Sequence, residues 1–181
     1  MSVADELKSG VTAVFNTDYA FAALKESGKV VTWGVAKCGG ESLSVVEELK
    51  SGVTAVFNTA GGFAALKESG KVVTWGDVVS GGDSLCVADE LKSGVTVVFN
   101  TGGAFAALKE GGKVVTWGHA KWGGDSSSVA DELKSGVLTV FNSERAFAAL
   151  KEGGKVVTWG HAEWGGDSEL SLIHISEPTR H

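Results

Sequence analysis

Two histidines at a regular spacing are the first residues in this sequence that could bind a metal. His119 and His161 stand 42 residues apart, and each directly follows a Trp-Gly pair. The residues 84 and 42 positions before His119 are Val35 and Asp77, so the spacing does not extend the histidine set. A structural zinc site needs about four ligands. We therefore expect no metal site and no cofactor.

Lysine and glutamate recur side by side, and such pairs could serve acid–base chemistry. Each pair precedes a glycine turn, where we expect a solvated hairpin end, because a catalytic site rarely recurs identically in every copy of a repeat. The sequence contains no phosphate-binding loop, no HExxH motif and no Ser-His-Asp set. We expect no enzyme and no catalytic residue; the alternative is a metal-dependent or enzymatic cleft at the strand ends. The lysines are Lys25, Lys67, Lys109 and Lys151.

A carboxylate follows each of four Gly-Gly pairs and precedes a serine. A cation could bind at such positions, but carboxylates in turns commonly accept hydrogen bonds from backbone N–H groups. We expect this turn-stabilising role. The four residues are Glu41, Asp83, Asp125 and Asp167.

The charge pattern argues against nucleic-acid and membrane partners. The 181 residues carry a net charge of −6, with lysines and carboxylates interspersed, so there is no basic stripe that could neutralise phosphates. No stretch approaches the roughly 20 apolar residues of a membrane helix. The N-terminus lacks the basic and apolar regions of a signal peptide, which favours a cytoplasmic location.

Most of the chain consists of four copies of one 42-residue unit, at 1–42, 43–84, 85–126 and 127–168. Two motifs recur in register, without an insertion or deletion. LKSGV begins at Leu7, Leu49, Leu91 and Leu133, and VVTWG begins at Val30, Val72, Val114 and Val156. Regular self-similarity of this kind is the sequence signature of a repeat architecture.

Within one copy the local patterns predict three strands. Residues 11–16 (VTAVFN) mix β-branched and aromatic residues, 21–26 (FAALKE) follow a short polar loop, and 29–34 (KVVTWG) follow a Ser-Gly turn. Before the first strand, Ser2 and Asp5 have the spacing of a capping box, and Ser44 and Ser128 repeat it. We expect one helical turn at each of these places.

Three short strands cannot bury both of their faces, so the copies must pack on one another. Radial repetition into a β-propeller satisfies this need and explains why apolar residues occupy nearly every strand position. We therefore expect an all-β fold, a partial β-propeller of four three-stranded repeats. An open β-solenoid and a closed four-bladed propeller are the alternatives.

The repeats resemble a known superfamily, that of the regulator of chromosome condensation and β-lactamase inhibitor protein II. The resemblance covers all four copies and rests on the Trp-Gly pairs, such as Trp33-Gly34, and the Ala-Leu pairs, such as Ala23-Leu24. It implies a propeller, typically of seven blades. The repeats depart from the family pattern before the Ala-Leu pair, where the expected Gly-x-x-His is replaced by Thr17 and Ala20 in the first copy.

The last residues, 169–181, break the period and contain the one proline, Pro178. LSLIHISEPTRH, residues 170–181, is similar to the translated sequence of a sequencing adapter. We expect residues 169–181 to be a non-native, disordered segment. Four copies would then be a lower bound on the length of the native array.

Function is expected where the copies differ, because loop residues that are free of packing duties can bind a partner. Trp122 and Trp164 are the best anchor candidates, since aromatic residues dominate interface hot spots; alternatively they cover a neighbouring sheet. We predict a non-enzymatic protein-interaction scaffold, with a purely structural array as an alternative, and self-association through open sheet edges. The candidate partner-binding residues are Trp122, Trp164, His119, His161, Tyr19 and Arg145.

Overall fold

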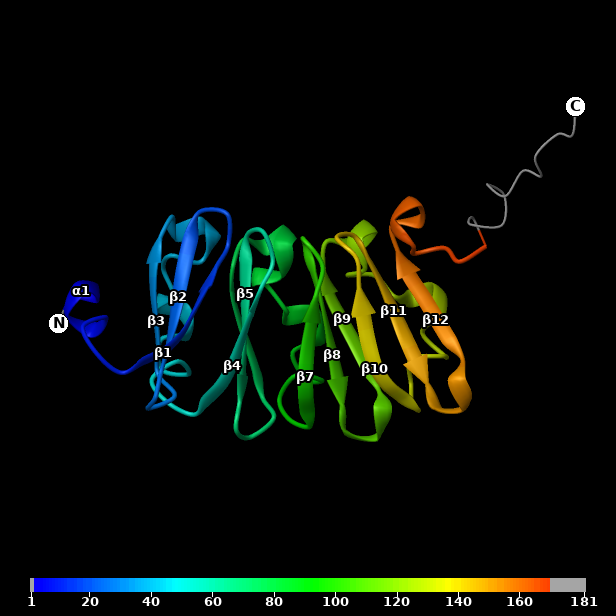
Figure 1. The fold of residues 1–181 in the computed structure, drawn as a ribbon, viewed down its shortest axis with the longest axis horizontal. Coiled ribbons are helices and arrows are strands. Elements are labelled where there is room, and N and C mark those ends of the chain that lie inside the picture. The colour runs from blue at the N-terminus through cyan, green and yellow to red at the C-terminus, as the bar shows by residue number, and fades with distance from the viewer. Residues whose placement is uncertain (1, 170–181) are drawn as a thin grey trace, which may run out of the picture.

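The computed structural model describes residues 2–169, which form an all-β structure (Figure 1). Each copy of the repeat forms one antiparallel three-stranded sheet, and its strands pair in sequence order. We number these sheets 1 to 4 along the chain. The strands are β1 (Val11–Asn16), β2 (Ala20–Lys25), β3 (Val30–Gly34), β4 (Val53–Asn58), β5 (Gly62–Lys67), β6 (Val72–Gly76), β7 (Val95–Asn100), β8 (Ala104–Lys109), β9 (Val114–Gly118), β10 (Val137–Asn142), β11 (Ala146–Lys151) and β12 (Val156–Gly160).

Short helical segments connect the strands. Helix α1 (Val3–Glu6) begins with the predicted capping box between Ser2 and Asp5. The boxes predicted at Ser44 and Ser128 do not form, because these serines lie inside helical turns instead of preceding them. No helix within residues 2–169 is long and apolar enough to cross a membrane. The other turns are η1 (Ala36–Cys38), η2 (Leu43–Val45), η3 (Val78–Gly82), η4 (Leu85–Val87), η5 (Glu110–Gly112), η6 (Ala120–Trp122), η7 (Ser127–Val129), η8 (Glu152–Gly154) and η9 (Ala162–Trp164).

The four sheets stand side by side in one row, with sheets 1 and 4 at opposite ends (Figure 1). Strands pair only within a copy, whereas a solenoid would pair strands of successive coils. The partial propeller is therefore confirmed, and the solenoid alternative is wrong. Because sheets 1 and 4 do not meet, the described residues do not form a closed four-bladed ring either.

Neighbouring sheets contact each other directly at their first strands, whereas a turn lies between them at their third strands. The first strands β1, β4 and β7 each lie next to the first strand of the following sheet, which is β4, β7 or β10. The third strand β6 instead packs against η1, the turn that leaves sheet 1, and β12 packs against η6 in the same way. Turns inserted on one side only make each copy wedge-shaped, which is the geometry of a propeller blade.

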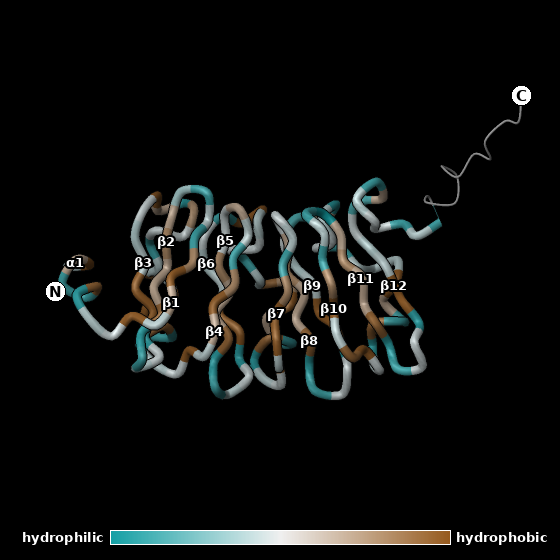
Figure 2. Tube along the Cα trace, in the orientation of Figure 1, coloured by the Kyte–Doolittle hydropathy of each residue, from teal (hydrophilic) through white to brown (hydrophobic). Residues whose placement is uncertain are grey.

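The hydrophobic core lies between the sheets rather than within one of them. Figure 2 shows apolar residues along the strands and polar residues in the connecting loops. Between sheets 1 and 2, Ala22 and Leu24 pack against Phe63 and Trp75, all of which are buried. Equivalent residues form the other two junctions. Each copy is therefore stabilised mainly by its neighbours.

A tryptophan fixes each junction between sheets. In sheet 3, the Trp117 ring stacks on Phe105 at 5.2 Å between centroids, and its Nε1 donates to the carbonyl oxygen of Gly81 at 3.1 Å. A Cβ atom at Gly81 would collide with the Phe105 ring, and the φ of Gly81 is +91°. Glycine is therefore required for this close approach. Trp75 and Trp159 repeat the arrangement.

The repeated lysines are not the solvated hairpin ends that the sequence predicted. The side chain of Lys109 is 17% exposed, and its Nζ donates to the backbone carbonyl and carboxylate of Glu90. Lys113 binds the same carboxylate at 2.5 Å. Both lysines therefore hold the turn after η4, which contains Glu90, against the hairpin of the same copy.

The aspartates that follow Gly-Gly pairs stabilise turns, as expected. The Asp125 Oδ1 atom accepts a hydrogen bond from the backbone N–H of Ser127 at 2.9 Å. Hydrogen bonds from Ser127 lower the pKa of Asp125, because they stabilise its charged form. Within the described residues, Glu41 makes no such bond. Asp83 accepts from Leu85 and Asp167 from Glu169, both at 2.8 Å.

Candidate partner-binding surface

The loops between the first and second strands are tied together across the sheets. The Asp18 N–H donates to the Ala60 carbonyl at 2.8 Å, and the Ala60 N–H donates to Gly102 at 2.8 Å. The Gly102 N–H in turn donates to Glu144 at 2.7 Å. These equivalent residues form a backbone ladder that runs along the whole row. The ladder places the variable loop residues at a fixed spacing.

Trp122, Arg145 and Trp164 form an aromatic–cationic row on one side of this ladder. The guanidinium carbon of Arg145 lies 4.6 Å from the ring centroid of Trp122 and 4.9 Å from that of Trp164. Arg145 belongs to the same copy as Trp164, whereas Trp122 belongs to the preceding copy. Cation–π contacts of this length are attractive, so Arg145 bridges sheets 3 and 4. Trp122 thus contacts the next sheet through Arg145, while Trp164 keeps 41% of its surface exposed.

Both histidines border this row. The His119 ring stacks on Trp122 with centroids 4.8 Å apart. The backbone N–H of His161 donates to the backbone carbonyl of Arg145 at 2.9 Å, as the equivalent residues do in the other copies. Three nitrogens, His119 Nδ1, His161 Nδ1 and Arg145 Nε, are buried and have no hydrogen-bond partner in residues 2–169. Buried nitrogens usually find partners. The His119 ring and the Arg145 guanidinium instead make stacking contacts with tryptophan rings.

Five of the six residues singled out from the sequence therefore converge, and one does not. Tyr19 occupies the position in copy 1 that Arg145 occupies in copy 4, at the far end of the ladder. Its side chain is 66% exposed. The intervening copies have Gly61 and Gly103 at this position, so no side chain links Tyr19 to the aromatic–cationic row.

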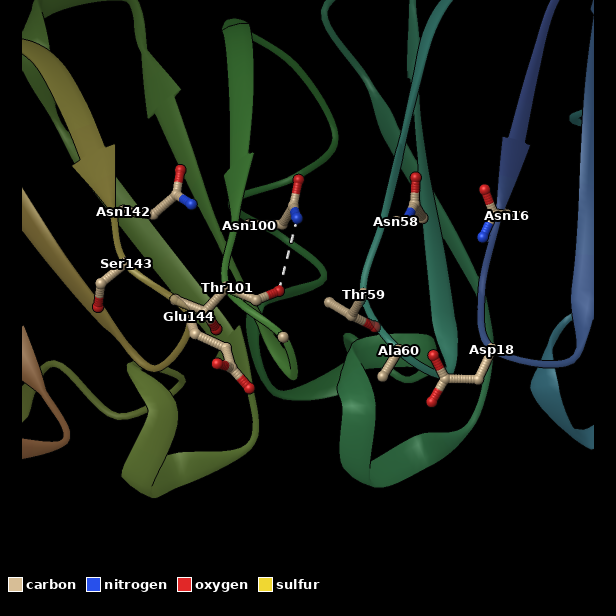
Figure 3. A pocket seen from close by; sticks show the side chains of 11 residues that line it. Asn16, Asp18, Asn58, Thr59, Ala60, Asn100, Thr101, Asn142, Ser143 and Glu144 are labelled. Atoms are coloured by element: carbon tan, nitrogen blue, oxygen red, sulfur yellow. Dashed lines mark hydrogen bonds between the residues drawn. The ribbon is translucent and has the colours of Figure 1, made fainter. Parts of the chain in front are cut away.

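A groove of about 550 Å³ runs along the ladder (Figure 3). Four asparagines, one at the end of each first strand, point into it, with Asp18 towards one end and Glu144 towards the other. No lysine or arginine lines the groove. It therefore offers amide groups and carboxylates to a ligand. The asparagines are Asn16, Asn58, Asn100 and Asn142.

The asparagine groove was missed in the sequence analysis, although its signal was present. Asn16 and its equivalents end every VFN motif at the 42-residue spacing, whereas the predicted partner-binding residues all stand at positions that vary between copies. A repeated polar residue lines a continuous surface when its copies stack in register. The described residues contain no group of three or more His, Cys, Asp or Glu side chains that could hold a metal ion.

No protein-family model matches this sequence, and no curated protein matches it. Among solved structures, Prp20p from Saccharomyces cerevisiae is similar, with 18% identity, a TM-score of 0.56 and coverage of 84% of this chain and 45% of that chain. Yeast RCC1 (Prp20) bound to Kap60 is similar too, with 18% identity, a TM-score of 0.57 and coverage of 84% and 44%.

The chain thus spans less than half the length of these similar proteins. Identity of 18% shows the fold alone. We conclude that this chain has an RCC1-like repeat fold, arranged as part of a β-propeller.

Proposed function

We propose that this chain is a non-enzymatic protein-interaction scaffold. Its partner binds the loops between the first and second strands together with the turns that follow the third strands. The observation that carries the proposal is the convergence of His119, Trp122, Arg145, His161 and Trp164. These residues differ from their equivalents in copies 1 and 2, and packing of the repeat does not require them. A repeat scaffold with variable residues gathered on one edge is typical of a binding surface.

Proteins with the same fold support a protein as the ligand. Prp20p binds Gsp1p and histones, and yeast RCC1 binds Kap60. We carry over only the class of ligand from these proteins, because the identity is 18%.

The chemistry of the groove favours a partner with a basic, extended segment. Asp18 and Glu144 lie near its ends, and no cation lines it. The asparagine amides between them can accept or donate hydrogen bonds to a peptide backbone. Complementary charge speeds encounter and selects partners. The indole of Trp164, beside the same loops, supplies an apolar anchor.

Fluorescence anisotropy with a labelled lysine-rich peptide that contains one leucine tests the proposal. We expect this peptide to bind more tightly than a matched glutamate-rich peptide, and we expect binding to weaken with salt. Trp164→Ala should weaken binding about 30-fold, as loss of a hot-spot aromatic worth about 2 kcal/mol does. The double variant Asp18→Asn, Glu144→Gln should reduce the preference for the basic peptide.

Leu85→Ala is the matched control, because Leu85 is 80% exposed and lies outside both surfaces. It should leave binding unchanged. Equal binding of the two peptides would contradict the basic partner. Unchanged affinity in folded Trp164→Ala would contradict the anchor and favour a purely structural array.

A further inference from the structure

The three junctions between sheets repeat the same three hydrogen bonds. At the first junction, Val30 N–H donates to the Leu49 carbonyl, Trp75 Nε1 to Gly39 and Asp18 N–H to Ala60. The equivalent bonds recur at the other junctions at closely similar lengths. These are Val72 to Leu91 (2.9 Å), Val114 to Leu133 (2.9 Å), Trp117 to Gly81 (3.1 Å), Trp159 to Gly123 (3.1 Å), Ala60 to Gly102 (2.8 Å) and Gly102 to Glu144 (2.7 Å).

At each end of the row, the donors and acceptors that would make these three hydrogen bonds lack partners within residues 2–169. On sheet 4, the N–H groups of Val156 and Glu144 and the carbonyl of Gly165 have no partner within residues 2–169. Sheet 1 and its preceding turn hold the complementary groups, which have none in that range either. They are the Leu7 carbonyl, the Asp18 carbonyl and Trp33 Nε1. Each free donor thus has its acceptor at the other end of the same chain.

The sheet-1 face, which we define by Val14, Phe21 and Trp33, is an uncovered copy of a surface that is buried elsewhere. Val14 is 56% exposed, whereas the equivalent valines of sheets 2 to 4 are 2–3% exposed. Phe21 is 44% exposed, whereas the equivalent phenylalanines are 0–1% exposed. This face is therefore built to pack against the turn and strands of a preceding copy.

The sheet-4 face, which we define by Phe141, Val156 and Gly165, is the matching surface. Val156 is 57% exposed, whereas the equivalent valines of sheets 1 to 3 are 5–6% exposed. At the internal junctions, the glycine equivalent to Gly165 lies against the phenylalanine ring of the next sheet, but a Cβ atom at Gly165 would meet nothing within 4 Å. The space beside Gly165 that a phenylalanine fills at the internal junctions, which we call the phenylalanine seat, is therefore open.

We propose that the sheet-4 face of one chain docks on the sheet-1 face of a second chain and repeats the internal junction. Val156, Glu144 and Gly165 would then pair with Leu7, Asp18 and Trp33 of the second copy. The phenylalanine seat at Gly165 would receive Phe21. For the 181-residue chain, a second copy is the occupant because apolar shape and all three hydrogen bonds match at once.

The same docking extends the aromatic–cationic row. Tyr19 is the equivalent of Arg145, which contacts the tryptophan of the preceding copy. Tyr19 of the second chain would therefore contact Trp164 of the first, and Trp164 would stay partly exposed, as Trp122 does beside Arg145. Two chains contribute eight sheets, which is within the range of about four to eight blades that propellers close with. Head-to-tail contacts of this kind form a ring when the rotation closes, so we expect a particle of two chains.

Two valine substitutions, each at one face, test the pairing. Val14→Lys blocks the sheet-1 face and Val156→Lys blocks the sheet-4 face; both side chains are exposed in the single chain, so folding should persist. Light scattering after size exclusion should give two chains per particle for the unsubstituted protein and one for either variant alone. Leu85→Lys, at an exposed residue outside both faces, should keep two.

Mixing the two single variants gives the decisive result. Each variant keeps one intact face, and the intact faces complement each other, so the mixture should form pairs with one copy of each variant. The double variant Val14→Lys, Val156→Lys should stay single in every mixture. A single-chain particle for the unsubstituted protein would overturn the proposal, and so would folded single variants that pair as before or fail to pair with each other.

Discussion

Each copy of the repeat uses one glutamate to bind two lysines. In copy 3 the Glu90 carboxylate contacts Lys113 at 2.5 Å and Lys109 at 3.2 Å. The hydrogen bond from Lys113, followed by that from Lys109, lowers the pKa of Glu90 below its ordinary value of 4.5. The contacts of Glu48 with Lys67 and Lys71 lower its pKa in the same way. Ionisation of these glutamates is therefore linked to folding.

Replacement of Glu90 should make stability less sensitive to acid. Because the pKa of Glu90 is lower in the folded state, its contribution is present above the unfolded value and is lost as the pH falls through the folded value. Glu90→Gln should therefore be less stable than the unsubstituted protein at pH 7, and the difference should shrink towards pH 3. Urea unfolding at several pH values measures this.

Glu68→Gln is the matched control for this titration. Glu68 lies on an exposed turn and makes no ion pair within residues 2–169. Its substitution removes no ion pair, so it should change stability at pH 7 much less than Glu90→Gln does. A Glu90→Gln difference that stays constant between pH 7 and pH 3 would contradict the linkage.

At the scale of elements, the strands were predictable because their signals are local. VTAVFN, FAALKE and KVVTWG each hold β-forming residues bounded by turn residues, and all three form strands in every copy. The partners of Lys109 and Arg145 were not predictable. Their contacts join residues from separate turns or copies, and a 42-residue period shows which residues are equivalent but not which side of a sheet they face.

Substitutions at two equivalent glycines can distinguish the contribution of packing between sheets from that of backbone strain. Gly81 and Gly165 have similar positive φ values, +91° and +98°, so alanine strains the backbone similarly at both. Only at Gly81 would the added Cβ atom collide with Phe105. Gly81→Ala should therefore destabilise the protein by about 1–3 kcal/mol more than Gly165→Ala, the usual range for overpacking.

Thermal and urea unfolding of the two glycine variants measure this difference. Both should be made together with Val14→Lys and Val156→Lys, so that pairing of chains does not cover Gly165. Equal destabilisation would show that the Phe105 ring moves aside without cost. The close approach of glycine to the phenylalanine would then contribute nothing to the junction.

At the scale of the whole molecule, the row is a one-dimensional array. Every apolar cluster joins two adjacent sheets, and the backbone ladder joins the same neighbours. The stability of such an array is approximately the sum of its units and its nearest-neighbour junctions. Sheets 2 and 3 have two junctions each, whereas sheets 1 and 4 have one.

Hydrogen exchange should therefore reveal a gradient of protection along the row. In the double variant Val14→Lys, Val156→Lys, amides of β5 and β8 should exchange most slowly, and amides of β2 and β11 faster, because the end sheets can open after losing one junction. In the unsubstituted protein, docking of a second chain should raise protection of β2 and β11 towards that of β5 and β8. Mass spectrometry of exchanged peptides distinguishes these strands. Equal protection of all four strands in the double variant would show that the row opens only as a single cooperative unit.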